Sequence, residues 1–350
     1  MQKGLELADL ARTLEDLRPK KLDFVAPRSA LQAVVTGDKI KMHVPDRRES
    51  YGIRQSAHDQ IAGVLGIPTK YYTRMRTEAP SLLAANINEW LGRSTDRQLV
   101  RTLGGDMRAL LSDRYQRIEN EEIAEVVLPI LLQTPGVEIK SCQITESRMY
   151  IQATTSRVSG EVRVGDVVQA GVAISNSEIG QGAVSIQALI WRLICSNGAI
   201  APDGKFAARH VGRRIDASDD LNAIFSDETK RADDRAVLLK ARDVVTAALD
   251  EVRFGKTLEK MRGLTDIKLA GDPNKAIEVL AQKVGATETE RGGILRALIE
   301  GGDTSAWGFM NAVTAQAHVG DYDRAVELER AGGALIDLPA REWREILEPA

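Results

Sequence analysis

The sequence contains little cysteine and no long apolar run. Its 350 residues include two cysteines, too few for a disulfide framework or for a zinc site built from thiolates. The longest apolar stretch, Ala183 to Ile194, is interrupted by polar residues and is shorter than the roughly 18 residues that span a membrane. The first residues mix acids with leucines, unlike the basic and then apolar layout of a signal segment. These absences predict a cytoplasmic protein without membrane attachment.

Motifs for cofactors, metals and covalent catalysis are also missing. There is no glycine-lysine phosphate loop, and Gly180-x-Gly182 lacks the strand and helix that flank a dinucleotide-binding turn. The four histidines lie far apart, without a second ligand at zinc-like spacing. Cys195 follows Leu193 and Ile194, so we expect it to pack in the core rather than act as a nucleophile. The sequence predicts no cofactor, no metal site and no catalytic residue; an enzyme with a site assembled from distant residues is kept as an alternative.

The net charge of -3 argues at first against a nucleic-acid partner, and the aromatic content of 4% argues against broad stacking on bases. The charge is unevenly distributed, however. The chain up to Asp216 holds 29 basic and 25 acidic residues, and the remainder holds 18 and 25. Basic clusters usually form a solvated surface, but a fold that gathers them attracts polyanions. The candidate nucleic-acid-binding residues are Arg108, Arg114, Arg117, Arg192, Lys205, Arg209, Arg213 and Arg214.

Hydrophobic periodicity predicts helices and short strands in the first part of the chain. Leucines at three- and four-residue steps predict an amphipathic helix from Leu7 to Leu17. Its apolar seam would dock on this chain or on a second copy, and we expect a homo-oligomer. Further helices are expected over Ile53 to Leu65, Ser81 to Trp90 and Asn120 to Leu132, and strands over Leu31 to Val35, Lys39 to Val44, Gln98 to Leu103 and Met107 to Leu111.

From Val137 the apolar period changes to two, which predicts an antiparallel β meander that ends near Cys195. After Ala217 the pattern returns to amphipathic helices with an excess of acids. The predicted fold is therefore α+β, with N-terminal helices packed on the meander and a mostly α-helical C-terminal region. The expected divisions are residues 1–50, 51–216 and 217–350.

Two polar turns of the meander attract attention. The first, Asn176 to Gly182, includes Glu178 and Gly180; it either reaches outward to offer backbone amides to an anion or a partner strand, or is an ordinary hairpin turn. The second, around Asn197 and Gly198, follows a strand with Trp191 and leads into the basic run. Basic side chains at a strand end suit phosphates, and aromatic faces suit bases, although Trp191 and Tyr150 are more simply explained as core residues.

Three segments together resemble a known family. Leu99 to Asn120, Ser175-Asn-Ser-Glu-Ile-Gly180 and Arg192-Leu-Ile-Cys-Ser-Asn-Gly198 are similar, in order and spacing, to the phage- and plasmid-related proteins grouped as domain of unknown function 932. The likeness covers roughly Ile53 to Arg214, and more loosely the helical region that follows. The resemblance implies an origin in mobile elements and assigns no catalytic residue.

These observations favour a non-enzymatic protein that binds nucleic acid, with single-stranded DNA as the expected partner, in recombination or replication of a mobile element. The predicted layout of helices, meander and acidic tail is similar, at the level of the fold alone, to that of annealing proteins of phage recombination. The alternative is an assembly or host-interaction protein that binds another protein and no DNA. A nucleic-acid enzyme with a dispersed site is the third possibility.

Overall fold

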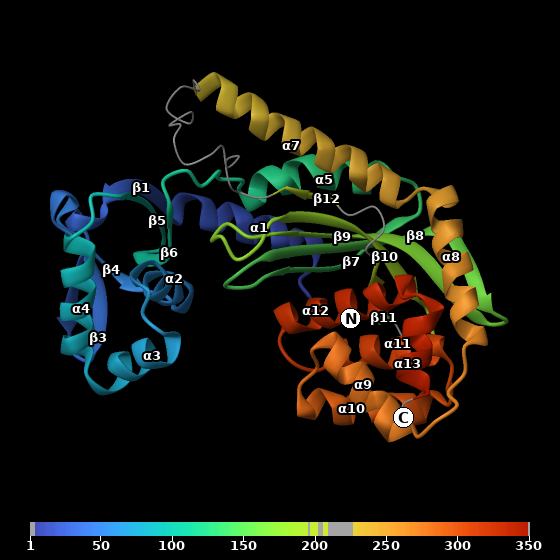
Figure 1. Cartoon of the computed structure of the whole chain (residues 1–350). Helices are drawn as coiled ribbons and strands as arrows, with labels where there is room; N and C mark the ends of the chain where they lie inside the picture. Colours follow the sequence, from blue (N-terminus) through green and yellow to red (C-terminus); the bar gives the residue numbers. More distant parts are fainter. Residues whose placement is uncertain (1–3, 195–196, 202–205, 209–226, 349–350) are drawn as a thin grey trace.

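The computed structural model describes residues 4–194, 197–201, 206–208 and 227–348, which form two lobes (Figure 1). Residues 21–112 form the first lobe. The second lobe contains an antiparallel meander between helical layers, and the helix at residues 7–17 belongs to it. The first lobe is therefore inserted between segments that pack together in the second lobe. No helix among the described residues is long and apolar enough to cross a membrane.

The first lobe is a mixed sheet covered by helices. Its strand order is β1-β5-β6-β4-β3-β2, antiparallel except where β4 meets β6. Ile61, Leu83 and Val100 lie in its apolar core. The first helix of this lobe, α2, ends at Gly66, which adopts the left-handed conformation with φ 65°, as a glycine at this position predicts. The elements are β1 (Lys21–Pro27), β2 (Gln32–Thr36), β3 (Lys39–Val44), β4 (Glu49–Ile53), α2 (Gln55–Leu65), α3 (Thr69–Glu78), α4 (Pro80–Gly92), β5 (Arg97–Leu103) and β6 (Asp106–Ser112).

The second lobe is built on the predicted meander. Its strands lie in the order β11-β10-β9-β8-β7, all antiparallel, and a short strand, β12, also pairs with β10. Sequential strands joined by short turns pair with their neighbours, which is the simplest arrangement for period-two segments. The strands are β7 (Val137–Ile144), β8 (Met149–Arg163), β9 (Asp166–Asn176), β10 (Val184–Arg192), β11 (Asn197–Ile200) and β12 (Phe206–Ala208).

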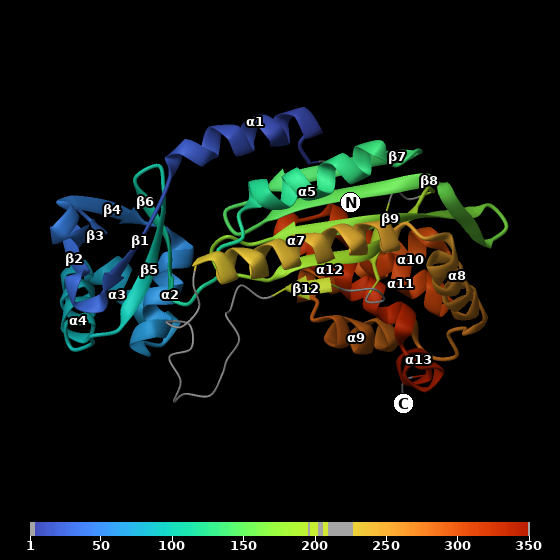
Figure 2. The same ribbon diagram turned by 90° about the horizontal axis from the view of Figure 1, so that it is seen from above.

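The helices over one face of the meander are α1 (Leu7–Leu17), α5 (Asn120–Gln133) and α7 (Asp227–Ala248), as Figure 2 shows. This face is apolar: Ile151, Val172 and Ile174 are buried in the same core as Leu10 and Leu14 of α1. A β-strand points alternate residues to opposite faces, so these side chains share one side of the sheet. The seam of α1 is thus covered by its own chain, which removes the reason for which a homo-oligomer was expected.

The C-terminal helices lie across the opposite side and the far end of the meander (Figure 1). Trp307, Phe309 and Trp343 are almost fully buried in their core. The helices are α8 (Glu251–Asp266), α9 (Pro273–Val284), α10 (Glu288–Gly301), α11 (Ala306–Ala315), α12 (Tyr322–Ala334) and α13 (Ala340–Leu347). Single 3-10 turns occupy Arg18–Lys20, Arg28–Ala30, Pro45–Arg47, Gln316–His318 and Leu335–Asp337.

The α+β class is confirmed, but the first sheet extends across the expected division at residue 50, while the expected division at residue 216 lies outside the described residues. The strands before residue 50 belong to the same sheet as β5 and β6, so residues 1–50 are not a separate unit. The helices α2–α4 pack on this first sheet, and only α1 and α5 of the early helices pack on the meander. The difference arises because β4 and β6 pair across about fifty intervening residues, a contact that leaves no periodicity in the sequence.

Candidate functional site

The hairpin between β9 and β10 does not reach outward. It enters the junction of the two lobes, where Asn176 and Glu178 are buried and Gly180 lies at the surface. The Asn176 side chain donates hydrogen bonds of 3.0 Å to the Ile118 carbonyl and 2.9 Å to Asn120 Oδ1. Gly180 adopts φ 76°, a conformation that glycine permits at the turn. The first four residues of this polar loop, 176–179, are therefore part of the protein interior, and Gly180 and Gln181 are exposed.

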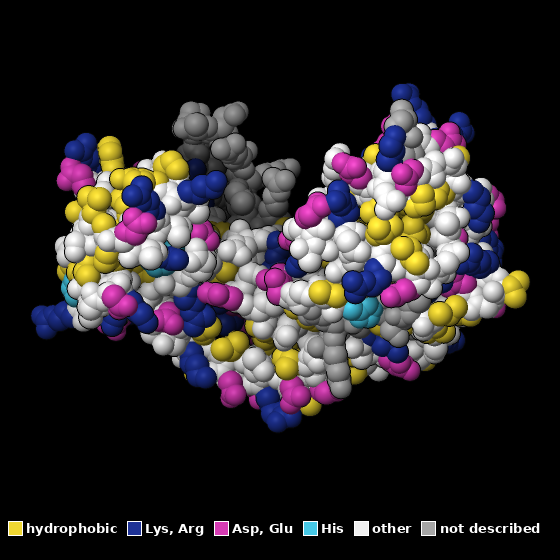
Figure 3. Space-filling model, turned by 90° about the horizontal axis from the view of Figure 1, so that it is seen from below, with side chains coloured by type: hydrophobic (Ala, Val, Ile, Leu, Met, Phe, Trp, Pro, Cys, Tyr) yellow, Lys and Arg dark blue, Asp and Glu magenta, His cyan; other side chains and the backbone are white. Residues whose placement is uncertain are grey.

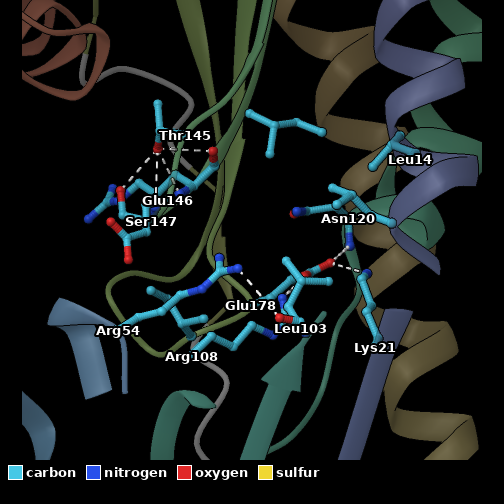
Figure 4. A pocket seen from close by; sticks show the side chains of 14 residues that line it. Leu14, Lys21, Arg54, Leu103, Arg108, Asn120, Thr145, Glu146, Ser147 and Glu178 are labelled. Atoms are coloured by element: carbon cyan, nitrogen blue, oxygen red, sulfur yellow. Dashed lines mark hydrogen bonds and ion pairs between the residues drawn. The ribbon is translucent and has the colours of Figure 1, made fainter. Parts of the chain in front are cut away.

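Glu178 is the centre of the junction. Its carboxylate accepts hydrogen bonds from Lys21 Nζ at 2.7 Å, from the Asn120 backbone at 2.7 Å and from Arg108 Nη1 at 2.5 Å. Figure 4 shows Glu178 between Arg108 and Lys21. Burial alone would raise the pKa of Glu178, but the charges of Arg108 and Lys21 lower it to about 2. The carboxylate is thus ionised and fully compensated at neutral pH.

Lys21 lies among three carboxylates. Its ammonium group is 3.1 Å from Glu119 Oε2, 2.6 Å from Glu121 Oε2 and 2.7 Å from Glu178 Oε1. These carboxylate oxygens lie within 4.8 Å of one another, a spacing that would suit a metal ion. The ammonium group already lies between them and satisfies its three donors there. We therefore interpret the group as a buried ion cluster rather than a metal site.

Arg101 extends this cluster into the first lobe. The side chain is completely buried, and its Nε donates to Asp23 Oδ2 at 3.0 Å. Its Nη1 donates to the Glu178 carbonyl at 2.6 Å, and Nη2 pairs with Glu119. Basic groups from β1, β5 and β6 thus meet acidic groups from α5 and the β9–β10 hairpin. Most charged atoms of the cluster are paired, although Asp23 Oδ1 and the Nε and Nη2 atoms of Arg108 have no hydrogen-bond partner among the described residues. We infer that such a cluster fixes the position of the two lobes more than it stabilises the fold.

A small cavity opens beside this cluster, with a volume of about 50 Å³. Binding sites for drug-sized ligands have roughly 300–1,000 Å³, so the cavity holds water or a small ion but no base or cofactor. Arg54 and Arg148 line it together with Arg108, as do Thr145 and Ser147 from the turn between β7 and β8. Seen from below, a hollow separates the lobes, with basic and acidic side chains around it (Figure 3).

The structure separates the eight predicted nucleic-acid-binding residues into three groups. Arg114 and Arg117 are exposed on the segment between β6 and α5, at the junction. Arg108 and Arg192 are largely buried, and each forms an ion pair with a carboxylate. Neither side chain therefore lies on a surface that a nucleic-acid strand could contact. The remaining four, Lys205, Arg209, Arg213 and Arg214, lie outside the described residues, as does Cys195.

Arg192 belongs to a second polar centre, at the end of the meander away from the junction. Its guanidinium forms a two-point ion pair with Asp166, at 2.6 and 2.8 Å. Trp307 Nε1 donates to the same carboxylate at 2.9 Å. Nearby in sequence, Asn197 Oδ1 lies 2.6 Å from His318 Nε2, and Gly198 lies where a Cβ would meet Leu189. Arg192 and Asn197 therefore connect the sheet to the C-terminal helical region.

Sequence reasoning missed Lys21, Asp23 and Arg101, which complete the junction. Asp23 lies between the apolar residues Leu22 and Phe24, and Arg101 follows Leu99 and Val100 within its strand. Charged residues are rarely buried unless they are paired, so a lone charge within an apolar strand indicates a buried partner. Asp23 and Arg101 pair with each other across the neighbouring strands β1 and β5, and Arg101 also binds Glu119 and the Glu178 carbonyl of the other lobe. Neither set of partners could be read from the sequence, because each lies far away along the chain.

These features define the class: a two-lobed α+β protein whose lobes meet at a buried ion cluster. Two of the three segments noted above contribute to that cluster, together with Lys21 and Asp23 of β1. The family described as Domain of unknown function (DUF932) matches residues 109–332, more than half of the chain, and the chain belongs to this family. The match begins in β6 and ends in α12, so it covers the meander and most of its helical layers. No curated protein and no solved structure matches the chain.

Proposed function

We propose that the chain binds single-stranded nucleic acid at the junction of its lobes, and that its main partner is single-stranded DNA. The binding is non-enzymatic and of the annealing type, in recombination or replication of a phage or plasmid. The observation that carries the proposal is the convergence of arginines from separate segments at this junction. Arg54 and Arg148 line its cavity, and Arg114 and Arg117 are exposed on the segment that crosses it.

The chemistry of the junction favours contacts to phosphate. Guanidinium groups bind phosphates by paired hydrogen bonds, and such contacts need no base pocket. The cavity of about 50 Å³ is too small for a base. Tyr150 and Trp191, the aromatic residues considered for stacking, are 3% and 8% exposed. Recognition would therefore depend on charge and backbone shape, without reading of bases.

Fluorescence anisotropy with a single-stranded oligonucleotide, measured across salt concentrations, tests the proposal. Arg54→Gln combined with Arg148→Gln should weaken binding at low salt and reduce the log-log salt slope by about 1.4, which is about 0.7 for each lost phosphate contact. The matched control is Arg93→Gln with Arg341→Gln, because both side chains are exposed on distant helices, at 64% and 88%. Equal effects of the two pairs, or no binding by the wild type, would overturn the proposal.

A protein partner is the second candidate function. Leu82 and Trp90 are 49% and 48% exposed on α4, and large apolar side chains on an outer surface suit protein contacts. Light scattering that shows a defined oligomer, lost in Trp90→Ser while oligonucleotide binding is absent in both proteins, would favour this function over the first.

A further inference from the structure

The two faces of the meander differ in chemistry. One face carries Ile151, Val172 and Ile174 and packs on α1, α5 and α7. The residues that alternate with these point to the other face, which is mostly polar. An antiparallel sheet with one polar face normally turns that face to water. Here the polar face is buried; its residues are Ser141, Tyr150, Gln152, Thr154, Ser175, Ser185 and Gln187.

The helix α12 covers this polar face, and its first turn provides the densest contact. Asp323 accepts hydrogen bonds from Thr145 Oγ1 at 3.0 Å, Ser147 Oγ at 2.5 Å and Tyr150 Oη at 2.8 Å. Three hydroxyl donors from the sheet and its turn thus surround one carboxylate. Hydroxyl groups arranged in this way bind an oxyanion, and the anion here is supplied by the protein itself.

The rest of the contact is partly hydrogen-bonded and partly apolar. Gln152 Nε2 donates to Glu329 Oε2 at 2.6 Å, so a second carboxylate of α12 lies over the sheet. Arg330 donates to Ser175 Oγ at 2.8 Å and to Gln187 Oε1 at 3.1 Å. A small apolar patch of Tyr150, Ala173, Leu189, Ile200, Tyr322 and Val326 completes the interface.

A contact of this kind separates more readily than an apolar one. When α12 leaves, water replaces it as the hydrogen-bond partner of the polar groups, so that little of their interaction energy is lost. Exposure of the apolar face would lose its hydrophobic stabilisation in full. The polar face therefore suits a surface that is covered in one state and open in another.

The covered face is continuous with the junction. Thr145 and Ser147, which bind Asp323, also line the cavity between the lobes, next to Arg148. A nucleic-acid strand bound by the arginines at the junction would thus contact the first turn of α12 directly.

We propose that the polar face of the meander is a second binding surface for single-stranded nucleic acid, and that α12 is a displaceable cover. In the covered state, Asp323 and Glu329 accept the hydrogen bonds of the polar face. Once α12 has moved, phosphates and base edges of the nucleic acid accept those hydrogen bonds instead. The inference rests on the proposed function, because it assumes that a strand reaches the junction. The inference adds regulation, because α12 and the nucleic-acid strand compete for the same hydrogen-bond donors of the polar face.

A matched pair of variants on α12 tests the cover. Asp323→Asn weakens the contact with the three hydroxyl groups. Glu327→Gln removes the same charge from the same helix, but Glu327 is 59% exposed and pairs with Arg324. We expect Asp323→Asn to bind a single-stranded oligonucleotide at least fivefold more tightly than the wild type, and Glu327→Gln to bind within twofold of it. Equal gains in the two variants, or no gain in Asp323→Asn, would overturn the competition.

Two further measurements separate this inference from the proposed function. Hydrogen exchange should be faster in the amides of α12 in Asp323→Asn, without a change in α5. Photocrosslinking of an iodouridine oligonucleotide should label the β8 peptide with Tyr150 in Asp323→Asn only. If no variant binds the oligonucleotide at low salt, the proposed function is wrong, and unchanged exchange in α12 would also refute the displaceable cover. Tight binding without the β8 crosslink would confine the strand to the junction and refute the second surface.

Discussion

The meander is buried on both faces, but by different means. Its apolar face packs on α1, α5 and α7 through aliphatic side chains. Its polar face and its hairpin tip are held by hydrogen bonds and ion pairs, to α12 on one side and to the first lobe on the other. The apolar contacts provide a driving force that is proportional to area and tolerant of orientation. The polar contacts add little net energy but require particular partners in particular positions.

The difference separates what makes the lobe fold from what places its neighbours. An apolar layer accepts several packings of similar energy, whereas an ion cluster such as that of Glu178 is satisfied in one arrangement only. We infer that the apolar face gives the second lobe its stability, and that the polar contacts set the positions of the first lobe and of α12. Four substitutions test this distinction.

The largest effect is expected at the junction, where a buried charge would lose its partner. Arg108→Ala leaves the buried Glu178 carboxylate without one of its two basic partners, which should lower the free energy of unfolding by about 3–5 kcal/mol. Urea denaturation measures the loss. Arg54→Ala, in the same cavity but with a side chain that is 31% exposed, should cost less than about 1 kcal/mol. Similar losses in the two variants would show that the ion pair with Glu178 contributes no more to the free energy of unfolding than a partly exposed arginine does.

A truncation on the apolar face should come next. Ile174 is 1% exposed in the core beneath α1, α5 and α7, so Ile174→Ala should cost about 2–5 kcal/mol through lost burial and a residual cavity. Val164→Ala, at a hairpin position that is 97% exposed, should remain within about 0.5 kcal/mol of the wild type. Chemical denaturation at pH 7 compares the two. A loss below 1 kcal/mol at Ile174 would contradict the assignment of stability to this face.

The polar face should contribute its own pH dependence through Glu329. Burial raises the pKa of Glu329 from 4.5 to about 7, so the folded protein holds a proton that the unfolded chain releases. The contribution of Glu329 to stability should therefore fall as pH rises from about 4.5 to 7, by up to about 1.4 kcal/mol per pH unit. Burial lowers the pKa of His58 to about 4, which acts in the opposite sense over the same range, so the comparison with the variant isolates Glu329. Glu329→Gln should flatten that part of the profile, and the exposed Glu327→Gln should not. Parallel profiles for the wild type and Glu329→Gln would refute the assignment.

The smallest effect is expected from a single hydroxyl group under α12. Tyr150→Phe keeps the ring and removes the hydrogen bond to Asp323, which should cost about 1 kcal/mol. Thermal unfolding followed by circular dichroism measures it. Faster hydrogen exchange in α12, with unchanged exchange in the helices on the apolar face, would further distinguish the two faces of the meander. A loss as large as that of Ile174→Ala would mean that the polar face contributes to stability like the apolar face.

Local structure could be predicted closely from the sequence where periodicity is strong. The helix from Leu7 to Leu17, the helix end at Gly66 and the strands of the meander were confirmed, because each depends on neighbouring residues. The pairing of β4 with β6 could not be predicted, because the contact is distant in sequence. The α+β class followed from the order of the elements alone.

The candidate site was harder to predict, because burial of polar groups leaves no periodic pattern. The loop from Asn176 to Gly182 has the composition of an exposed turn, yet Glu178 is buried by residues of the other lobe. Arg108 and Arg192 belong to basic clusters in sequence, but each is paired with a carboxylate at a distant position. The alternation in the meander indicated a polar face; the helix that covers it lies more than a hundred residues further along the chain.

The insertion of the first lobe affects how the protein is synthesised. The helix α1 is made first, but its partners α5 and β7 follow only after the whole first lobe. At roughly 5–20 residues per second, the leucines of α1 wait about 6–25 s on the ribosome before β7 is translated. During that interval the first lobe is free to fold alone, while Leu10 and Leu14 remain accessible to chaperones. The order of translation thus makes the first lobe the early folding unit, and α1 a segment that joins its core late.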